Sequence, residues 1–406
     1  MEQNHEYTIC AGWEQDTPIG TLHITKQRGK EIQSFTYNKD WLRTHPGLCL
    51  DPELLEYPGT QYARTGNFRF LSDTSPERWG RQLINKKEKQ QAAADNRPIR
   101  TLTENDYILG VSDYLRTGGL RIYDGTNFLV KEQSYVPSES DIRILQAASL
   151  NLEKNDAIEV VWLDQLCKFG SPLGGARPKV NIKDGEGNLW IAKFTSMRDV
   201  NHTEEWEQIT AELAKKCSLQ MAETKLINGK EKYIFLTKRF DRVQDTRIHF
   251  ASALTMLGKQ DGEDAGFMDV ANFIRNHTAQ PREDLKELWK RIVFTIAVSN
   301  TDCHLRNHGF ILQRDGWHLA PAYDMNPNEN GSSLALCVYG QNHSLDMGLA
   351  IQAASYCEID SPKSEIENIQ TIIKTNYVRL TEKYHIPRKE TIKMMRAFHL
   401  DISDRH

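Results

Sequence analysis

The 406-residue sequence predicts an α+β fold with a β-rich N-terminal part and a mostly helical C-terminal part. Three observations predict this class. Short apolar runs separated by turn residues occupy residues 1–150, which is typical of strands. Further strand-like pairs flank glycine-containing turns in the second half of the chain. Around them, apolar residues recur every three or four positions over long stretches, which indicates packed helices.

The N-terminal part is expected to contain strands and at least two helices. Its clearest strand-like runs are residues 7–12, 20–24 and 33–37. A helix is predicted to begin at Pro76 with Ser75 as its N-cap, because proline is favoured at the first helical position. A second helix is expected over residues 138–154. A domain boundary is therefore placed within residues 135–160.

The second half of the chain has a distinctive order of elements. The predicted order is a glycine-rich loop at 170–179, strands at 180–183 and 189–194, a helix at 203–216 and a strand at 233–240. A helix over residues 283–299 then leads into the polar segment NTDCHLRNHGF, residues 300–310. The apolar runs on either side of Asp315-Gly316 predict a hairpin, and Asp324 follows that hairpin.

Composition and charge narrow the range of functions. The formal net charge is −4 and 26% of the residues are charged, so no basic excess favours nucleic acid as the main ligand. The N-terminus lacks a basic-then-apolar signal, and no apolar run is long enough to span a membrane. The seven cysteines are odd in number and include no C-x-x-C pair, which is typical of reduced thiols. We therefore expect a cytoplasmic protein that does not bind membranes.

The segment at residues 300–310 carries residue types that suit phosphoryl transfer. That reaction needs Mg²⁺ held by oxygen ligands and a base near the attacking hydroxyl. The spacing from Asp302 to Asn307 is that of a protein-kinase catalytic loop, in which the aspartate is the base and the asparagine binds metal. Because a hairpin returns the chain near its start, Asp324 is expected to join them. The sequence thus predicts a metal–phosphate site.

A glycine-rich loop and a strand lysine would complete such a site. Gly174 and Gly175 allow backbone amides to approach phosphate oxygens, although an ordinary turn uses the same residues. Lys193 shares a strand face with apolar residues, which is costly unless the ammonium is paired or binds an anion. Glu207, on the following helix, is a candidate partner for that lysine. An edge lysine and a solvated glutamate are the ordinary alternatives.

Other interpretations of the polar segment stay open at this point. An isolated Asp-x-x-x-x-Asn spacing is weak evidence, because many such matches are ordinary loops in which the carboxylate caps a turn. Zinc binding by Cys303, His304 and His308 is a competing interpretation, although adjacent residues seldom converge on one tetrahedral ion. The ordered combination of glycine loop, lysine, glutamate, acidic loop and second aspartate favours the metal–phosphate site.

Several motifs along the chain together carry a family resemblance. They are LGGARPK (173–179), IAKF (191–194), TKRFDR (237–242), NTDCHLRNHGF (300–310) and APAYDMNP (320–327). With these motifs, residues 171–327 resemble the HipA-like serine/threonine kinases, the toxins of bacterial HipA–HipB toxin–antitoxin systems. GxLxI at 20–24 and SPERWGR at 75–81 are similar to the N-terminal subdomain of full-length members. The resemblance therefore covers nearly the whole chain.

The resemblance implies a two-lobed, protein-kinase-like (HipA-like) fold. It implies an N-terminal HipA-like subdomain at residues 1–150 and a part similar to a kinase N-lobe, with the glycine-rich loop and Lys193, at residues 151–245. A helical C-lobe with the catalytic loop and the metal-binding aspartate would occupy residues 246–406. It also implies ATP and Mg²⁺ as cofactors and protein serine or threonine as the phosphate acceptor, the activity of a non-specific serine/threonine protein kinase.

Roles for single residues follow from their motif positions. Asp302 would be the catalytic base, and His304 would support the catalytic loop. Asn307 and Asp324 would bind Mg²⁺, with Asn307 also counted in the catalytic set. The residues implied to bind ATP are Gly174, Gly175, Ala176, Lys179, Lys193, Lys238, Phe240 and Asp324.

Regulation and partners are implied in the same way. Family members autophosphorylate a serine of the glycine loop, which ejects the loop; Pro172 stands at that place here, and Ser171 is the candidate one residue earlier. The best-studied members phosphorylate an aminoacyl-tRNA synthetase. A HipB-like helix-turn-helix antitoxin would neutralise the kinase and make most of the DNA contacts. The alternatives for this chain are a small-molecule kinase of the aminoglycoside type and a pseudokinase-like binding protein.

Overall fold

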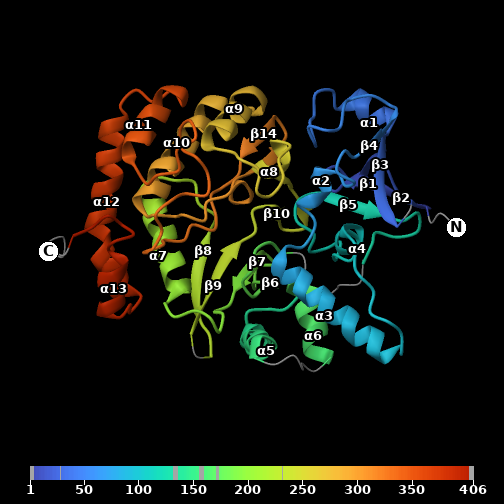
Figure 1. Ribbon diagram of the computed structural model, residues 1–406, viewed down its shortest axis with the longest axis horizontal. Coiled ribbons are helices and arrows are strands. Elements are labelled where there is room, and N and C mark those ends of the chain that lie inside the picture. Colours follow the sequence, from blue (N-terminus) through green and yellow to red (C-terminus); the bar gives the residue numbers. More distant parts are fainter. Residues whose placement is uncertain are drawn as a thin grey trace. The chain divides into compact units, whose positions relative to one another are not determined.

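The structure of the protein is a computed structural model that describes residues 4–27, 29–130, 136–154, 160–170, 173–230 and 232–401. The chain forms two compact units, each of which contains strands and helices (Figure 1). The first unit consists of Met1–Met197, Gly229–Lys232 and Lys238–Ala251, and the second of Arg198–Asn228, Tyr233–Thr237 and Ser252–His406. Within the described residues, no helix is both long and apolar enough to cross a membrane. The domain division at residues 150 and 245 stays a prediction.

An antiparallel five-stranded sheet of order β4-β3-β2-β1-β5 forms the core of the first unit, where the early strands are blue in Figure 1. Its strands are β1 (Asn4–Ala11), β2 (Thr17–Gln27), β3 (Lys30–Tyr37), β4 (Thr60–Tyr62) and β5 (Leu120–Tyr123). The first three match the strand-like runs predicted from the sequence. Ile9, Leu22 and Phe35 are fully buried on one face of this sheet, because side chains alternate between the two faces of a strand.

Six helices are described in the first unit, and two of them, α3 and α5, begin later than predicted. They are α1 (Lys39–Thr44), α2 (Arg69–Ser72), α3 (Arg78–Ala94), α4 (Glu104–Leu109), α5 (Ile142–Lys154) and α6 (Val160–Gly170). The prediction that Ser75 caps a helix beginning at Pro76 is wrong, because α3 begins at Arg78 with Glu77 as its N-cap. The hydroxyl of Ser75 instead donates to the carboxylate of Glu104 at 2.7 Å, and its oxygen accepts from the guanidinium of Arg81 at 3.3 Å.

Short strands complete the first unit. They are β6 (Lys179–Lys183), β7 (Leu189–Lys193), β10 (Arg242–Val243), β11 (Thr246–Arg247) and β12 (His249–Ser252). β6 and β7 form the predicted hairpin, with Lys179 directly opposite Lys193. Asp184 fixes the turn between them, because its carboxylate accepts the backbone N–H groups of Glu186 at 3.0 Å and Asn188 at 2.8 Å. The second predicted helix is α5, which begins at Ile142 rather than at residue 138.

The second unit is mostly helical. Its helices are α7 (Thr203–Lys216), α8 (Ala253–Met256), α9 (Phe267–His277), α10 (Pro281–Ala297), α11 (Met347–Tyr356), α12 (Pro362–Lys383) and α13 (Arg388–Met394). The helix predicted at 203–216 matches α7 at both ends. Pro281 begins α10, as expected for a residue whose missing N–H costs nothing in the first turn. Leu288, Trp289 and Ile292 of α10 are fully buried, which explains the helical period of apolar residues in this stretch.

Two hairpins accompany these helices. Their strands are β8 (Thr224–Asn228) with β9 (Tyr233–Lys238), and β13 (Gly309–Gln313) with β14 (Gly316–Leu319). The hairpin predicted around Asp315-Gly316 is therefore confirmed, with Gln313 opposite Gly316. β13 directly follows the acidic loop, and the chain after β14 is held beside Gln220 by an Ala322 N–H donating to the Gln220 carbonyl at 2.7 Å.

Candidate active site

The loop between α10 and β13 folds back so that Asp302 and Asn307 lie together. The backbone N–H of His304 donates to the Asp302 carbonyl at 3.0 Å, and that of Asn307 donates to the His304 carbonyl at 2.8 Å. A 3-10 turn, η1 (Leu305–Asn307), closes the loop. The side-chain amide nitrogen of Asn307 donates to the Asp302 carbonyl at 3.0 Å. The amide oxygen Oδ1 is therefore the atom of Asn307 that can bind a cation.

Two side-chain hydrogen bonds join this loop to the segment around Asp324. The hydroxyl of Tyr323 donates to the carbonyl of Arg306 at 2.6 Å. The amide of Asn328 donates to the hydroxyl of Thr301 at 2.8 Å. Since these bonds tie both ends of the acidic loop to residues on either side of Asp324, the structure confirms that the hairpin brings the two aspartate-bearing segments together.

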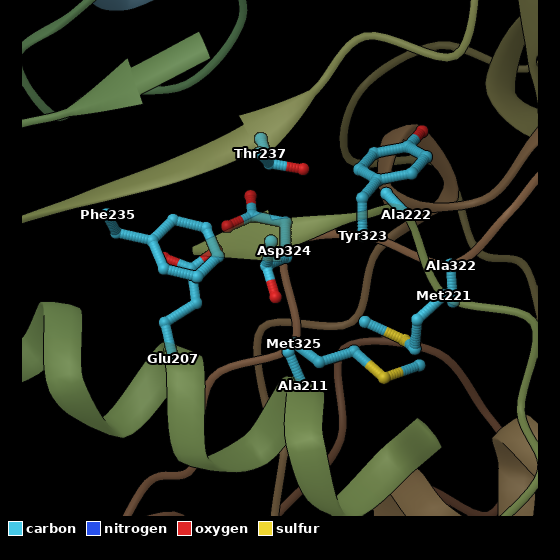
Figure 2. A pocket seen from close by; sticks show the side chains of 11 residues that line it. Glu207, Ala211, Met221, Ala222, Phe235, Thr237, Ala322, Tyr323, Asp324 and Met325 are labelled. Carbon is cyan, nitrogen blue, oxygen red and sulfur yellow. The ribbon is translucent and has the colours of Figure 1, made fainter. Parts of the chain in front are cut away.

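Asp324 itself has an unusual backbone conformation. Its φ angle is +56°, in the left-handed region that non-glycine residues seldom occupy and that is found disproportionately at functional sites. The Asn326 amide donates to its carboxylate at 3.1 Å. Figure 2 shows this side chain in a pocket that also receives Glu207 from α7 and Thr237 from β9. The pocket is otherwise lined mainly by apolar groups, among them Phe235 and Met325.

The surroundings of Asp302 shift the pKa of its carboxyl group. Asp302 is an exposed residue, but the surrounding chain partly withdraws its carboxyl group from water, and this raises its pKa above the ordinary value. Asp324 adds to that rise through its negative charge, whereas His304 opposes it. The like charges of Asp302 and Asp324 repel each other, and a cation bound beside them would relieve that repulsion.

Directly beneath the loop lies a buried thiol–imidazole pair. The Sγ atom of Cys303 lies 3.0 Å from Nε2 of His308, and both side chains are buried. Burial raises the pKa of Cys303 to about 12 and lowers that of His308 to about 3, so the pair is neutral. Zinc binding by these residues with His304 is not supported, because the set of potential ligands found close together in the described chain lies elsewhere, at Asp264, Cys337 and His343.

The glycine loop and the two predicted lysines belong to the first unit. Lys179 and Lys193 face each other across the β6–β7 hairpin, and both are buried. Gly175 has a φ of +79°, and a Cβ atom there would lie 2.6 Å from the Lys179 ammonium. A larger residue at this position would thus strain the backbone and displace the lysine. Gly174 and Ala176 are exposed on the same loop.

Glu77 is a residue of this loop region that sequence reasoning missed. Its carboxylate accepts the backbone N–H of Gly175. The Gly175 carbonyl in turn accepts the N–H of Trp79 at 3.0 Å. The glycine loop is therefore held from both sides by the SPERWGR segment. That segment carried a family resemblance, but no spacing in the sequence pointed to contact across about a hundred positions.

Lys238 and Phe240, which the family resemblance implies bind ATP, are also in the first unit. The Lys238 ammonium lies 5.9 Å from the centre of the Trp190 ring, and Phe240 packs against Phe250 with ring centres 5.9 Å apart. Both are half-buried, and their role in binding ATP stays a prediction. Ser171 and Pro172, the positions considered for autophosphorylation, lie outside the described residues.

This architecture and site define a kinase-like α+β protein of the HipA type. The structure aligns with Shewanella oneidensis HipA, solved in a complex with HipB and its operator DNA, with a TM-score of 0.68. The alignment covers 97% of this chain and 96% of that one at 16% identity, so it establishes the fold. The family model of the HipA-like C-terminal domain matches residues 171–396. The chain belongs to that family.

Two curated relatives match a smaller part of the chain. A Haemophilus influenzae protein named "Putative kinase" is 27% identical over 181 residues, which cover 38% of this chain and 52% of that protein. "Putative kinase Y4mE" of Sinorhizobium fredii is 27% identical over 174 residues, which cover 38% of this chain and 41% of that protein. The chain thus spans about half the length of the curated relatives it matches.

Proposed function

We propose that this protein is an ATP- and Mg²⁺-dependent serine/threonine protein kinase of the HipA toxin type. The observation that carries the proposal is the joining of Asp302, Asn307 and Asp324 by hydrogen bonds of the loop and its neighbouring segment. Two carboxylates and an amide oxygen are hard oxygen donors, which suit Mg²⁺ rather than a softer metal. Bound there, Mg²⁺ would neutralise charge on the phosphates of ATP.

Each residue of the site has a role in this proposal. Asp302 accepts the proton of the attacking hydroxyl, and the backbone bonds through His304 hold it in position. Asn307 and Asp324 hold the cation. The residues proposed to bind ATP are Gly174, Gly175, Ala176, Lys179, Lys193, Lys238 and Phe240.

A protein is the proposed acceptor. The exposure of Asp302 supports this, because a hydroxyl on another macromolecule can reach the base without entering an enclosed cavity. We take an aminoacyl-tRNA synthetase as the acceptor to test first, and a HipB-like helix-turn-helix protein as the partner that neutralises the kinase and contacts DNA. The complex in which the Shewanella oneidensis HipA was solved supports the partner. A cytoplasmic location is part of this proposal.

Self-regulation completes the proposed function. A phosphate on Ser171 would add about −1.5 to −2 charges at neutral pH, next to a loop that holds anionic phosphates. Such a charge would compete with ATP and favour an inactive loop. Intact mass before and after incubation with Mg-ATP, followed by peptide mapping, tests this step; phosphate found only at other positions would contradict it.

The deciding experiment measures phosphate transfer from labelled ATP. Wild-type protein is offered lysate proteins in one arm and small alcohols, including aminoglycosides, in the other. Asp302→Asn should lower transfer to protein by about 10²–10⁴-fold, because the base is lost while its size is kept. Asp360→Asn, which changes an exposed aspartate of the same unit, is the matched control. Transfer only to small alcohols, or undiminished transfer by Asp302→Asn, would refute the proposal.

A further inference from the structure

A second cluster of metal-ligand side chains lies in the second unit, in residues that the proposed kinase chemistry does not use. Asp264, Cys337 and His343 each offer one ligand atom, and these atoms all lie within 4.8 Å of one another. The carboxylate is exposed, the thiol is buried and the imidazole is half-buried, so the cluster opens to solvent on one side. A carboxylate, a thiol and an imidazole together are a mixed O, S and N donor set, which suits zinc-class cations and not Mg²⁺.

The backbone around the cluster is held in place. The Cys337 N–H donates to the Ala265 carbonyl at 3.4 Å, and the Phe267 N–H donates to the Cys337 carbonyl at 2.9 Å. The Leu334 N–H donates to the His343 carbonyl at 2.8 Å. This bond closes the segment 334–343, which carries Cys337 and His343. Cys337 and His343 therefore lie on paired backbone, and Asp264 directly precedes Ala265, whose carbonyl takes part in that pairing.

The side chains are oriented in a way that favours a cation. Nδ1 of His343 lies 3.0 Å from the Leu334 carbonyl, so it carries the proton and leaves Nε2 with the lone pair. Metal-binding histidines usually show this arrangement, in which the second nitrogen donates to a carbonyl or carboxylate. Gly266 leaves the room that the sulfur needs, because a Cβ atom there would lie 2.2 Å from Sγ of Cys337.

The electrostatic surroundings agree with this arrangement. The carboxylates of Asp264 and Asp269 both act electrostatically on the Cys337 sulfur, so the surroundings of the cluster are negatively charged. A cation beside the sulfur would offset both negative charges. Asp269 itself accepts the N–H of Gly266 at 2.8 Å, so it is already committed to capping α9.

We infer that Asp264, Cys337 and His343 form a binding site for one zinc-class divalent cation, with its fourth position open to water. Bound metal would clip the N-terminal end of α9 to the segment 334–343. Because metal would bind the folded chain and not the unfolded one, it would raise the melting temperature. The inference is independent of the kinase proposal, since none of its residues is assigned to catalysis or to ATP.

Co²⁺ added to the full-length, metal-free protein tests this site by spectroscopy. We expect one equivalent to produce a thiolate-to-cobalt charge-transfer band in the near ultraviolet, together with visible bands of a four-coordinate ion. Zn²⁺ should displace the cobalt and raise the melting temperature. A Co²⁺ ion held at Asp324 and Asn307 would have oxygen ligands only, so it would give no thiolate band and could not be mistaken for this site.

Single variants assign the ligands. Cys337→Ser should abolish the charge-transfer band. Asp264→Asn and His343→Asn should each weaken binding by about tenfold or more, since even the loss of a group that only supports a ligand costs that much. Cys49→Ser is the control, because Cys49 is the one cysteine of the described chain that is not fully buried.

Asp264 is exposed, so Asp264→Asn should fold like the wild type. At least one ligand variant therefore remains informative. Absence of the charge-transfer band in the wild type would overturn the inference. So would a band that survives in Cys337→Ser, or Zn²⁺ stabilisation that is unchanged in Asp264→Asn.

Discussion

Asp241, a buried aspartate of the first unit, and Asp302 of the candidate site have opposite electrostatic surroundings. In the first unit the carboxylate of Asp241 lies 2.6 Å from Arg239 and 3.0 Å from Arg242, and it accepts the N–H of Gly118 at 2.7 Å. Burial alone would raise the pKa of Asp241, but the two arginines outweigh burial and hold the pKa well below its usual range. The charge is thus compensated by the chain itself.

The candidate site in the second unit shows the reverse. The pKa of Asp302 is raised, first by loss of hydration and then by the charge of Asp324. No arginine contributes to that shift among the causes that act on Asp302. The comparison teaches that burial does not by itself separate structural from functional carboxylates. The causes that shift each pKa differ: two arginines lower the pKa of Asp241, whereas a second carboxylate raises the pKa of Asp302.

The largest expected effect is on stability, through the buried carboxylate of Asp241. Asp241→Asn should lower the free energy of unfolding by about 3–5 kcal/mol, because Arg239 and Arg242 would be left buried without their counter-charge. Chemical denaturation at neutral pH measures this. The control is Asp40→Asn, which breaks an exposed pair with Arg43 and should cost no more than about 1 kcal/mol. Equal, small losses for both variants would remove the distinction.

The same variant has a defined pH dependence. Folding lowers the pKa of Asp241 from its ordinary 3.8, so its charge stabilises the folded protein above that value. The contribution is lost as the pH falls through the lower folded-state pKa. The stability gap between wild type and Asp241→Asn should therefore be full at neutral pH and narrow in acid. A gap that widened in acid would contradict the assignment.

The next effect is on Asp324 of the candidate site, where function and stability should separate. Asp324→Asn should remove most of the Mg²⁺ dependence of ATP binding, because the carboxylate is the proposed metal ligand. Its stability should change by less than about 1 kcal/mol, since asparagine keeps the size of the side chain and tolerates the left-handed conformation at φ +56°. Calorimetric titration of ATP with and without Mg²⁺, beside a denaturation curve, checks both. Unchanged Mg²⁺ dependence would exclude Asp324 from the metal site.

The helices, the hairpin and the acidic loop of the second unit could be predicted from local sequence patterns. The helical period of α10, the Asp-Gly hairpin and the spacing from Asp302 to Asn307 are each set by residues near in sequence. The predicted ranges 203–216 and 283–299 lie close to the observed bounds of α7 and α10. The convergence of Asp324 on the loop also followed, because a hairpin of known length leaves the chain few places to go.

Contacts between residues far apart in the sequence could not be predicted. The motif TKRFDR suggested an ATP-side role, but nothing in it showed that Arg239 and Asp241 form a buried charge cluster with the backbone near Gly118. Nor could spacing show Glu77 at the glycine loop, or Asp264 beside Cys337. Such pairings depend on how whole elements pack, and one sequence without relatives carries no signal for them.

A smaller effect tests whether the buried, neutral pair of Cys303 and His308 positions Asp302. We expect a coupling energy of about 0.5–1.5 kcal/mol between Cys303 and His308, the usual worth of one neutral hydrogen bond. A double-mutant cycle with Cys303→Ala and His308→Phe measures it by denaturation. If the pair positions the base, both variants should also lower kcat while KM for ATP stays the same. Additive stability losses with unaltered kcat would show that the two residues only fill space.

The smallest expected effect concerns Glu77, a carboxylate of the first unit that contacts the predicted glycine loop. Glu77 accepts the N–H of Gly175, the kind of group that would otherwise bind a phosphate oxygen. Glu77→Gln keeps the size and an acceptor oxygen but removes the charge that competes with the triphosphate. ATP affinity should therefore rise, by less than tenfold, which corresponds to about 1.4 kcal/mol. Glu186→Gln, on the exposed turn of the β6–β7 hairpin, is the control and should leave affinity unchanged. A fall in affinity for Glu77→Gln would mean that the carboxylate organises the glycine loop for ATP, which would place Glu77 with the compensated, structural charges of its unit.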